Sequence, residues 1–275
     1  MIVLGGSSRQ SLAALRVALD NALNGVSAGD ASAISSDLFK ALVAIDSSTG
    51  MRRALTDSAR DSASKSELVS DLFKKSIGAK ALSLLGTAVS LRWSAPSGIA
   101  DAIEQIAVEA EAASANLSNS LDQVQSEIFN FSTLLIENPD LRTALSDRAQ
   151  SPESKQVLLN NIFGAKFSAS TNNLLSHSVE IRRARSIEKT IAAYSHAVTA
   201  RRNRVNAHIK SSIALSDGQA KKLADSLTKK IGQPVHLNIE IDPNVLGGIS
   251  IRFGDEVIDG TISNRLAEAS RALVS

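Results

Sequence analysis

The sequence predicts a mostly α-helical protein, in which two small tandem helical bundles precede a small α+β domain with the order β-α-β-β-β-α. Three observations lead to this fold class. A stretch of sequence recurs 90 residues further along the chain, and apolar residues before it recur at helical spacing. From about residue 204 the apolar period changes from 3.6 to two. We expect domains at residues 1–97, 98–203 and 204–275.

The internal repeat determines the expected domain organisation. Residues 36–73 align without a gap with residues 126–163, and the same register continues to residue 92 with 16 identities in 57 positions. Ala and Ser richness produces chance identities, but it does not produce matched aromatic and charged residues in one register. The matched pairs include Phe39 with Phe129, Arg52 with Arg142, Asp57 with Asp147, Lys65 with Lys155 and Phe73 with Phe163. The pattern indicates a duplicated domain.

Five helices are predicted in the first copy. Leucines at positions 12, 15, 19 and 23 mark the first, and Gly25 is its stop signal. The next three contain residues 38–45, 51–55 and 68–73, and Ser64 with Glu67 is the expected capping box of the third of these. Residues 81–92 give the fifth helix.

The second copy is expected to repeat this order. Ser151 followed by Pro152 predicts a helix start, because proline is tolerated at the first helical position. Residues 98–113 fit either the closing helix of the first copy or the opening helix of the second. A period of 90 residues is short for two complete six-helix units, so a helix shared by both copies is the preferred interpretation.

The C-terminal part reads as strands around one helix. Residues 205–209 and 235–241 alternate apolar and polar residues, which is typical of half-buried strands. Between them, Ser216 and Gln219 open a helix that Gly232 ends. Further strands are expected at residues 249–253 and 257–258, and a last helix at residues 261–273.

Composition and motifs argue against catalysis. The chain has no cysteine and only 3% aromatic residues, so thiolate chemistry and large aromatic ligand pockets are not expected. The four histidines are dispersed, and neither a phosphate-binding loop nor a nucleophile elbow is present. We predict no catalytic residues, no cofactor and no metal. The longest charge-free apolar stretch, residues 81–91, is too short for a membrane span of about 18 residues, so direct membrane insertion is not expected.

A basic segment provides the alternative interpretation. Residues 181–230 contain 12 Lys or Arg against 3 Asp or Glu, a net charge of +9. Such a segment suits a scaffold or nucleic-acid-binding protein. Tyr194 is the only aromatic residue in it that could stack on a base, so nucleic acid is the weaker interpretation and an acidic protein partner or a solvated helix the stronger.

The C-terminal sequence carries a family resemblance. Residues 239–273 contain Asp242-Pro243, Leu246-Gly247-Gly248-Ile249, Gly254, Ile258-Asp259-Gly260 and Arg265-Leu266. This combination resembles the signature of the δ subunit of F-type ATP synthases, called the oligomycin-sensitivity-conferring protein in mitochondria. The resemblance covers about residues 100–275, and a second copy of the helical domain explains residues 1–100, as in the extended δ proteins of actinobacteria.

The signature residues have structural interpretations. Gly247 and Gly248 suit a bulge or a close backbone approach, and Gly254 and Gly260 suit turns. We expect Asp259 to cap the final helix and Arg265 to pair with a carboxylate such as Asp242.

The resemblance implies a non-catalytic stator subunit of the proton-translocating ATP synthase. Members of the family fasten the head of α and β subunits to the peripheral stalk of b-type subunits, so that proton-driven rotation is coupled to ATP synthesis. The implied location is the cytoplasmic face of the bacterial cell membrane, as a peripheral protein.

In the family, a groove between the first and fifth helices of the bundle takes an N-terminal segment of α. In this chain that groove lies between residues 98–113 and 172–183, with Ile103, Ile106, Leu175 and Val179 as candidate wall residues. Bundle core is the alternative interpretation for each of the four. We expect the second copy to bind the head and the first copy to lie against the stalk.

Overall fold

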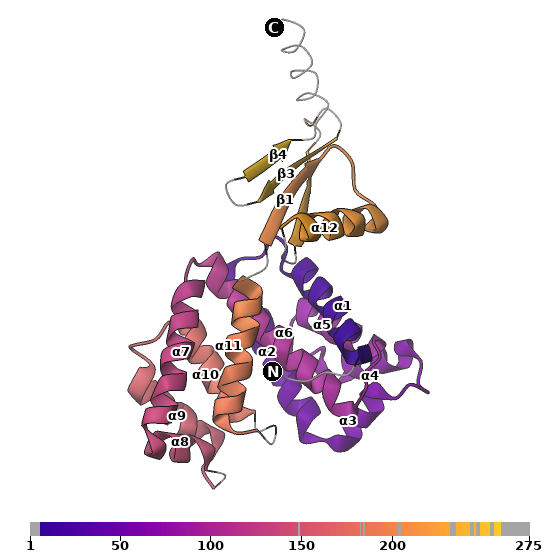
Figure 1. Cartoon of the computed structure of the whole chain (residues 1–275). Coiled ribbons are helices and arrows are strands. Elements are labelled where there is room, and N and C mark those ends of the chain that lie inside the picture. The colour runs from indigo at the N-terminus through magenta and orange to yellow at the C-terminus, as the bar shows by residue number, and fades with distance from the viewer. Residues whose placement is uncertain are drawn as a thin grey trace, which may run out of the picture. The chain divides into compact units, whose positions relative to one another are not determined.

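The computed structural model describes residues 6–147, 149–181, 183, 185–202, 205–231, 235–242, 245, 248–253 and 256–259. The chain divides into two compact units, residues 1–201 and 202–275. Every regular element described in the first unit is a helix, whereas the second unit contains a small mixed sheet and a helix (Figure 1). The expected mostly helical fold with a C-terminal α+β part is confirmed.

The first half of the helical unit contains the five predicted helices. They are α1 (Gly6–Ala22), α2 (Ala28–Ser47), α3 (Thr49–Thr56), α4 (Ser62–Phe73) and α5 (Ala79–Ser90). Gly25 follows α1 with a φ of 67°, the left-handed angle that ends many helices.

The capping box predicted from Ser64 and Glu67 is wrong. Asp61 is the N-cap of α4, and its carboxylate accepts a hydrogen bond from the backbone N–H of Ser64. Ser64 therefore lies inside the first turn, and the Asp61 carboxylate accepts from the Ser64 N–H group that the Glu67 side chain would have served in the predicted box. A capping box does occur at the start of α2, between Ser27 and Asp30.

Residues 98–113 belong to one continuous helix, α6 (Pro96–Leu117). Sixteen of its residues are buried, and it contacts α1, α2, α3 and α5 of the first half. On its other sides it contacts α7 (Leu121–Glu137) and α10 (Ala169–Glu180). The many alanines of α6 let neighbouring backbones approach closely, so a single helix packs inside both halves.

The second half contains α7, α8 (Pro139–Ser146), α9 (Pro152–Phe163), α10 and α11 (Ile187–Arg202). The helix start predicted at Ser151 and Pro152 is confirmed, with the Ser151 hydroxyl accepting from the backbone N–H of Ser154. The bounds of α8, α9 and α10 lie 90 residues after those of α3, α4 and α5.

Two hydrogen bonds between elements recur at the same offset. The carboxylate of Asp37 in α2 accepts from the backbone N–H of Gly78, at 2.8 Å, just before α5. The carboxylate of Glu127 in α7 accepts from the backbone N–H of Ser168, at 3.0 Å, just before α10. An acidic residue of α2 thus fixes the start of α5, and an acidic residue of α7 fixes the start of α10 in the same way.

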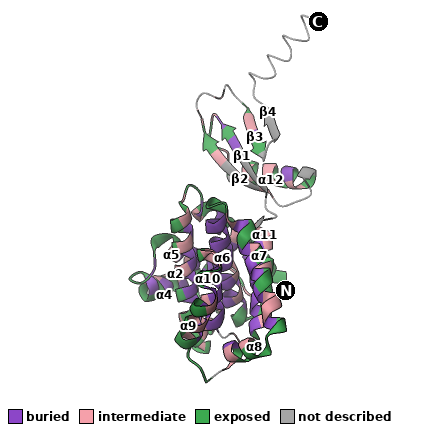
Figure 2. Cartoon of the chain, turned by 90° about the vertical axis from the view of Figure 1, so that its left-hand side faces the viewer, coloured by how far each residue is buried: buried purple, intermediate pink, exposed green. Residues whose placement is uncertain are grey.

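The core of the helical unit is continuous across both halves. A single cluster of buried apolar side chains extends from α1 to α11, and buried residues run along α6 and α10 in the middle of the unit (Figure 2). Its largest fully buried side chains are those of Tyr194, Phe39 and Phe131. The two halves therefore share one core.

The C-terminal unit consists of β1 (Val205–Ser211), α12 (Asp217–Ile231), β2 (Val235–Ile241), β3 (Ile249–Phe253) and β4 (Glu256–Asp259). The sheet order is β2-β1-β3-β4, with β1 and β2 parallel and the other pairs antiparallel. Ile209, Leu227 and Ile251 form its core. The helix start predicted at Ser216 and Gln219 is confirmed, and these two residues form a capping box. The predicted last helix, residues 261–273, lies outside the described residues.

Candidate functional site: the groove between α6 and α10

The four predicted wall residues come from two neighbouring helices. Ile103 and Ile106 lie on α6, and Leu175 and Val179 lie on α10. All four are buried, with at most 2% of each side chain exposed. The structure therefore brings the helices of the predicted groove together but leaves no open surface at these positions.

The groove is filled by α2, which packs along α6 and also contacts α10. The hydroxyl of Ser35 donates to the carbonyl oxygen of Ala107 at 2.8 Å. The hydroxyl of Ser32 donates to the carboxylate of Glu111 at 2.9 Å, and the amide of Asn173 on α10 donates to the same carboxylate at 3.3 Å. A helix of the chain itself thus occupies the place expected for a partner helix.

Phe39 is the apolar anchor of this packing. Its ring stacks on the His177 ring of α10, with centroids 4.1 Å apart, and lies 6.2 Å from the Tyr194 ring of α11. Phe39 has no exposed surface. Burial of a whole phenyl ring with a stacked partner makes this one of the strongest apolar contacts between the halves.

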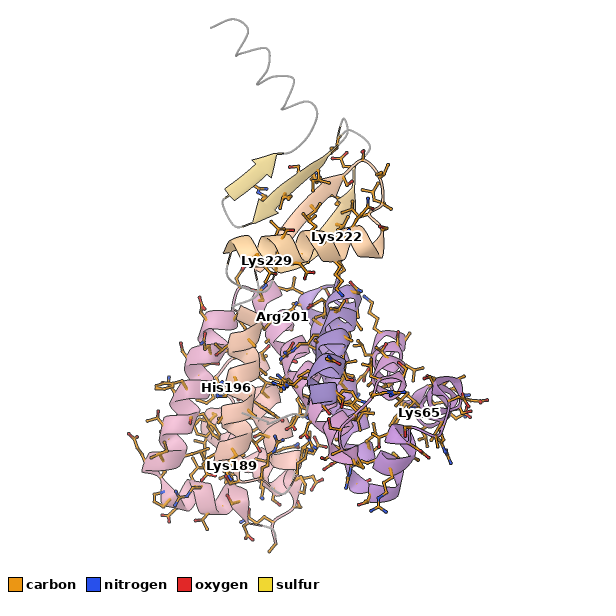
Figure 3. The ribbon with its side chains drawn as sticks, turned by 45° about the vertical axis from the view of Figure 1, so that its right-hand side comes forward. Lys65, Lys189, His196, Arg201, Lys222 and Lys229 are labelled. Atoms are coloured by element: carbon orange, nitrogen blue, oxygen red, sulfur yellow. The ribbon has the colours of Figure 1, made fainter. Side chains whose placement is uncertain are left out.

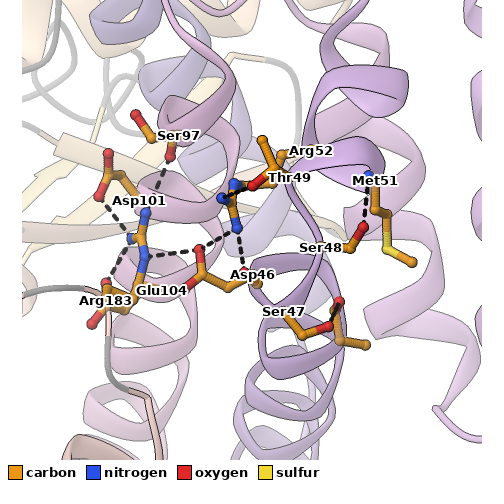
Figure 4. A network of polar contacts seen from close by, with 11 residues as sticks. Asp46, Ser47, Ser48, Thr49, Met51, Arg52, Ser97, Asp101, Glu104 and Arg183 are labelled. Atoms are coloured by element: carbon orange, nitrogen blue, oxygen red, sulfur yellow. Dashed lines mark hydrogen bonds and ion pairs between the residues drawn. The ribbon is translucent and has the colours of Figure 1, made fainter.

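A buried ion-pair network lies beside the anchor (Figure 4). The Nη1 atom of Arg183 lies 2.7 Å from the carboxylate of Asp101 and 2.9 Å from that of Glu104, both on α6. Its Nε lies 3.5 Å from the carboxylate of Asp46 on α2. Arg183 also donates to the carbonyl oxygen of Ser97 at 3.2 Å. The guanidinium therefore joins the second half to α2 and α6.

The network shifts the protonation equilibria of its members. Burial opposes the charged form of Arg183, but the carboxylates of Asp101 and Glu104 outweigh it and raise its pKa. Burial raises the pKa of the Tyr194 hydroxyl well above its ordinary value, with the charge of Glu104 acting in the same direction. Both shifts favour the charged form of Arg183 and the neutral form of Tyr194.

Further ion pairs turn basic side chains of the 181–230 segment inward. Arg185 pairs with Glu104, and Arg201 near the end of α11 pairs with Asp20 of α1. Arg201 and the exposed Lys189 lie at opposite ends of α11 (Figure 3). Three arginines of the basic segment, Arg183, Arg185 and Arg201, are therefore neutralised by carboxylates. This arrangement weakens the nucleic-acid interpretation.

A cavity of about 560 Å³ adjoins the groove in the second half. Val179 is part of its wall, and Lys155, with 2% of its surface exposed, donates from Nζ to the carbonyl oxygen of Leu145 at 2.6 Å. Lys155 thereby satisfies a carbonyl in the last turn of α8, where a cation is favoured by the helix dipole. The position of this repeated lysine is thus explained by helix capping.

Among the signature residues with an expected structural role, Asp242 and Gly248 lie within the described residues, as does the backbone of Asp259. The carboxylate of Asp242 lies 3.6 Å from Lys210 Nζ, and Gly248 has a φ of 81°, which favours glycine as expected. The backbone of Asp259 pairs with Ser250 at the end of β4. Pro243, Gly247, Gly254, Gly260 and Arg265 lie outside the described residues, so the expected cap and the Arg265–Asp242 pair stay predictions.

Within the described residues, no group of three or more His, Asp or Glu is arranged to hold a metal ion. None of the described helices is long and apolar enough to cross a membrane.

Sequence reasoning missed the contacts that fill the groove. The signal that could have revealed them is the acidic content of α6, where Glu104, Glu109 and Glu111 interrupt a run of Ala, Ile and Val. A glutamate on a helix that is apolar on all sides requires a buried cation or hydrogen-bond donor. Arg16 serves Glu109 at 2.6 Å, and the partners of the other two are described above.

Comparisons with known proteins agree with the resemblance seen in the sequence. The family model "ATP synthase delta (OSCP) subunit" matches residues 100–273. Proteins called "ATP synthase subunit delta" from Streptomyces coelicolor and Thermobifida fusca are each 36% identical to the chain, covering 98% of both sequences. The protein of the same name from Frankia alni is 33% identical, and the match covers 98% of this chain and 99% of the Frankia sequence.

Among solved structures, a chain of the Toxoplasma gondii mitochondrial ATP synthase hexamer is similar, with 17% identity and a TM-score of 0.27. The match covers 61% of this chain and 97% of that one. A score this low supports no conclusion about the fold.

Proposed function

Because the chain belongs to the ATP synthase delta (OSCP) family, it is a non-catalytic stator subunit of the F-type ATP synthase, and we propose that it fastens the α/β head to the b-type peripheral stalk. The single observation that carries this function is similarity to δ subunits over 98% of the chain. The finer assignment of surfaces to partners is our proposal.

The physical role follows from the rotation of the enzyme. The central rotor turns inside the head, and a head that is free to turn with it would take up no work from the proton gradient. A stator subunit must therefore transmit torque without yielding. A helical unit with one continuous core and buried ion pairs between its halves suits that task. The protein acts as a peripheral subunit at the membrane.

We further propose that the helical unit arose by duplication, with α1–α5 as the first copy and α7–α11 as the second. The proposal is supported by the 90-residue spacing of three helix pairs and by the recurring hydrogen bonds of Asp37 and Glu127. In this proposal α6 serves both copies, as the closing helix of one and the opening helix of the other.

The second copy is our candidate for the head, because it directly precedes the C-terminal unit that carries the family signature. Ile103, Ile106, Leu175 and Val179 are buried, so a partner helix would reach them only by displacing the packing around them, in which α2 lies along α6. The first copy is our candidate for a contact that lengthens the attachment to the stalk.

Membrane vesicles test the stator function. Vesicles from cells that lack the chain are expected to hydrolyse ATP without pumping protons, and purified chain is expected to restore the coupling. Affinity-tagged chain should bring down α, β and b subunits from detergent-solubilised membranes. Full coupling without the chain, or recovery of RNA without those subunits, would contradict the function.

The role of the first copy needs a separate experiment. Deleting residues 1–95 is expected to weaken stalk binding, but the deletion also uncovers α6 and so needs a check of folding. A photo-crosslinking residue at exposed Val17 or Leu72 leaves the core intact and is expected to label a b-type subunit. Labelling of α or β alone would disprove this assignment.

A further inference from the structure

We propose that the outward face of α7, formed by Phe129, Ser132, Thr133 and Ile136, is a docking surface for an amphipathic helix of the α/β head whose apolar side is flanked by Lys or Arg. We call these four residues the α7 face. The proposal rests on the stator function and names a surface of the second copy outside the α6–α10 groove.

The α7 face presents two large apolar side chains to solvent. Phe129 is 68% exposed and Ile136 is 70% exposed, more than any other large apolar side chain described in the helical unit. A spacing of seven residues places both on one side of the helix, two turns apart. α7 also lies at the outside of the unit (Figure 1). An exposed aromatic and an aliphatic side chain on one helix face are typical of a protein interaction site.

The repeat indicates what kind of partner fits. Phe129 corresponds to Phe39 at the offset of 90 residues, and Phe39 is fully buried between helices. The ring of Phe39 is covered by α10 and by the Tyr194 ring of α11. Phe129 on α7 is therefore a phenylalanine whose counterpart in the first half packs against other helices.

The polar residues of the α7 face define the width of the apolar stripe. The counterparts of Ser132 and Thr133 on α2 are Leu42 and Val43, and Leu42 is fully buried. Two hydroxyl residues in their place leave a narrower stripe on α7. A single helix with one apolar ridge covers such a stripe, whereas α2 requires helices on two sides.

The acidic residues around the α7 face indicate which charge a partner helix should carry beside its apolar side. α7 contains no Lys or Arg, and acidic Asp122 and Glu137 are exposed near its two ends, with Asp140 just beyond. A partner helix with basic residues beside its apolar ridge would be complementary. A second copy of this chain is unsuitable, because pairing two α7 faces in either direction would bring acidic ends together.

The decisive measurement compares binding of full-length chains to the δ-depleted α/β head and, separately, to b-type stalk subunits. The double variant Phe129→Ser, Ile136→Ser is expected to bind the head about tenfold more weakly or worse, since apolar anchors dominate such contacts. Its binding to the stalk should equal that of the wild type. Val17→Ser, which alters a similarly exposed apolar residue on α1, should bind the head as the wild type does.

Each outcome has a distinct meaning. If wild-type chain fails to bind the head, the stator function is wrong. If it binds and the double variant binds equally well, only the docking surface is wrong. A photo-crosslinking residue at position 129 supplies a readout that does not depend on folding of the double variant. It should label α or β, whereas exclusive labelling of b or of a second copy of this chain would overturn the proposal.

Discussion

α2 and α7 are counterparts in sequence but lie in different surroundings. Phe39 of α2 is fully buried, whereas Phe129 of α7 is 68% exposed. Near the C-terminal ends of the helices, Asp46 of α2 lies 3.5 Å from Arg183, and its counterpart on α7 is the exposed Ile136. The chain supplies a partner for α2 and supplies none among its described residues for the outer side of α7.

The comparison teaches that similar sequences form the same local structure even where the surroundings of the two helices differ. Both helices form, and each fixes the following fifth helix through an acidic side chain. The environment differs because α6 and α10 contact α2, whereas Phe129 and Ile136 on the outer side of α7 are exposed. The two helices therefore differ in what surrounds the corresponding rings of Phe39 and Phe129.

The largest expected effect concerns Arg183, which pairs with Asp46 of α2 and has no corresponding partner on α7, where Ile136 takes the place of Asp46. Arg183→Met should lower the free energy of unfolding by about 4 kcal/mol, because it leaves the partly buried Asp101 without a cation and the buried Glu104 with Arg185 as its remaining cation. Urea unfolding followed by circular dichroism measures the loss. Arg142→Met is the control, since Arg142 lies 3.7 Å from Glu188 with 45% of its side chain exposed and should cost at most about 1 kcal/mol. Equal losses would show that Arg183 is no special link between the halves.

The two phenylalanines test the comparison directly. Phe39→Ala should cost roughly 3 kcal/mol or more, because it removes a buried ring that stacks on His177. Phe129→Ala should change the free energy of unfolding by no more than about 0.5 kcal/mol, as exposed substitutions do. The single Trp93 provides a fluorescence probe for both variants. A similar loss from Phe129→Ala would mean that α7 is covered within the chain, and the comparison would fail.

A feature that the two helices share should respond to acid. Burial raises the pKa of Glu127, but hydrogen bonds from Thr171 and Ser168 outweigh it, so the pKa lies below its ordinary value. A lowered pKa means that the stabilisation is present above the ordinary value near 4.5 and is lost as the pH falls through the folded pKa.

Glu127→Gln should therefore cost about 1.5 kcal/mol near pH 7 and progressively less below about pH 4. Unfolding curves of both proteins between pH 7 and pH 3 provide the measurement. Asp37→Asn removes the counterpart carboxylate of α2 and should also destabilise the protein at pH 7. A pH-independent cost of Glu127→Gln would indicate that shape, and not charge, holds the start of α10.

Local signals predicted most of the fold. The leucine spacing of α1, the stop at Gly25 and the Ser151-Pro152 start all act within a few residues, so the sequence displays them directly. The strand alternation of β1 and β2 was equally visible. The Ser64 capping box failed because Asp61, three residues earlier, accepts from the backbone N–H of Ser64 and begins the helix before it.

The groove shows what local signals do not contain. Ile103 and Leu175 were assigned to the correct pair of helices, but the presence of α2 between a partner and these residues depends on contacts some 70 residues apart in the chain, such as that of Ser35 with Ala107. An apolar stripe looks the same whether the chain itself or another subunit covers it. Only the buried glutamates of α6 pointed to an internal partner.

The smallest expected effect concerns the caps of the two short helices α3 and α8, which lie 90 residues apart in the sequence. Ser48 caps α3 by accepting a hydrogen bond from the backbone N–H of Met51 at 3.2 Å, whereas its counterpart Asn138 makes no such bond at α8, which begins with Pro139. Ser48→Ala should therefore cost about 1 kcal/mol. Asn138→Ala should cost less, because proline at the first helical position already removes one N–H group that needs a partner. Thermal unfolding of the two variants decides the order. A larger loss at position 138 would show that the side-chain bond from Asn138 to the carbonyl oxygen of Leu134 contributes more to α7 and α8 than a cap contributes to α3.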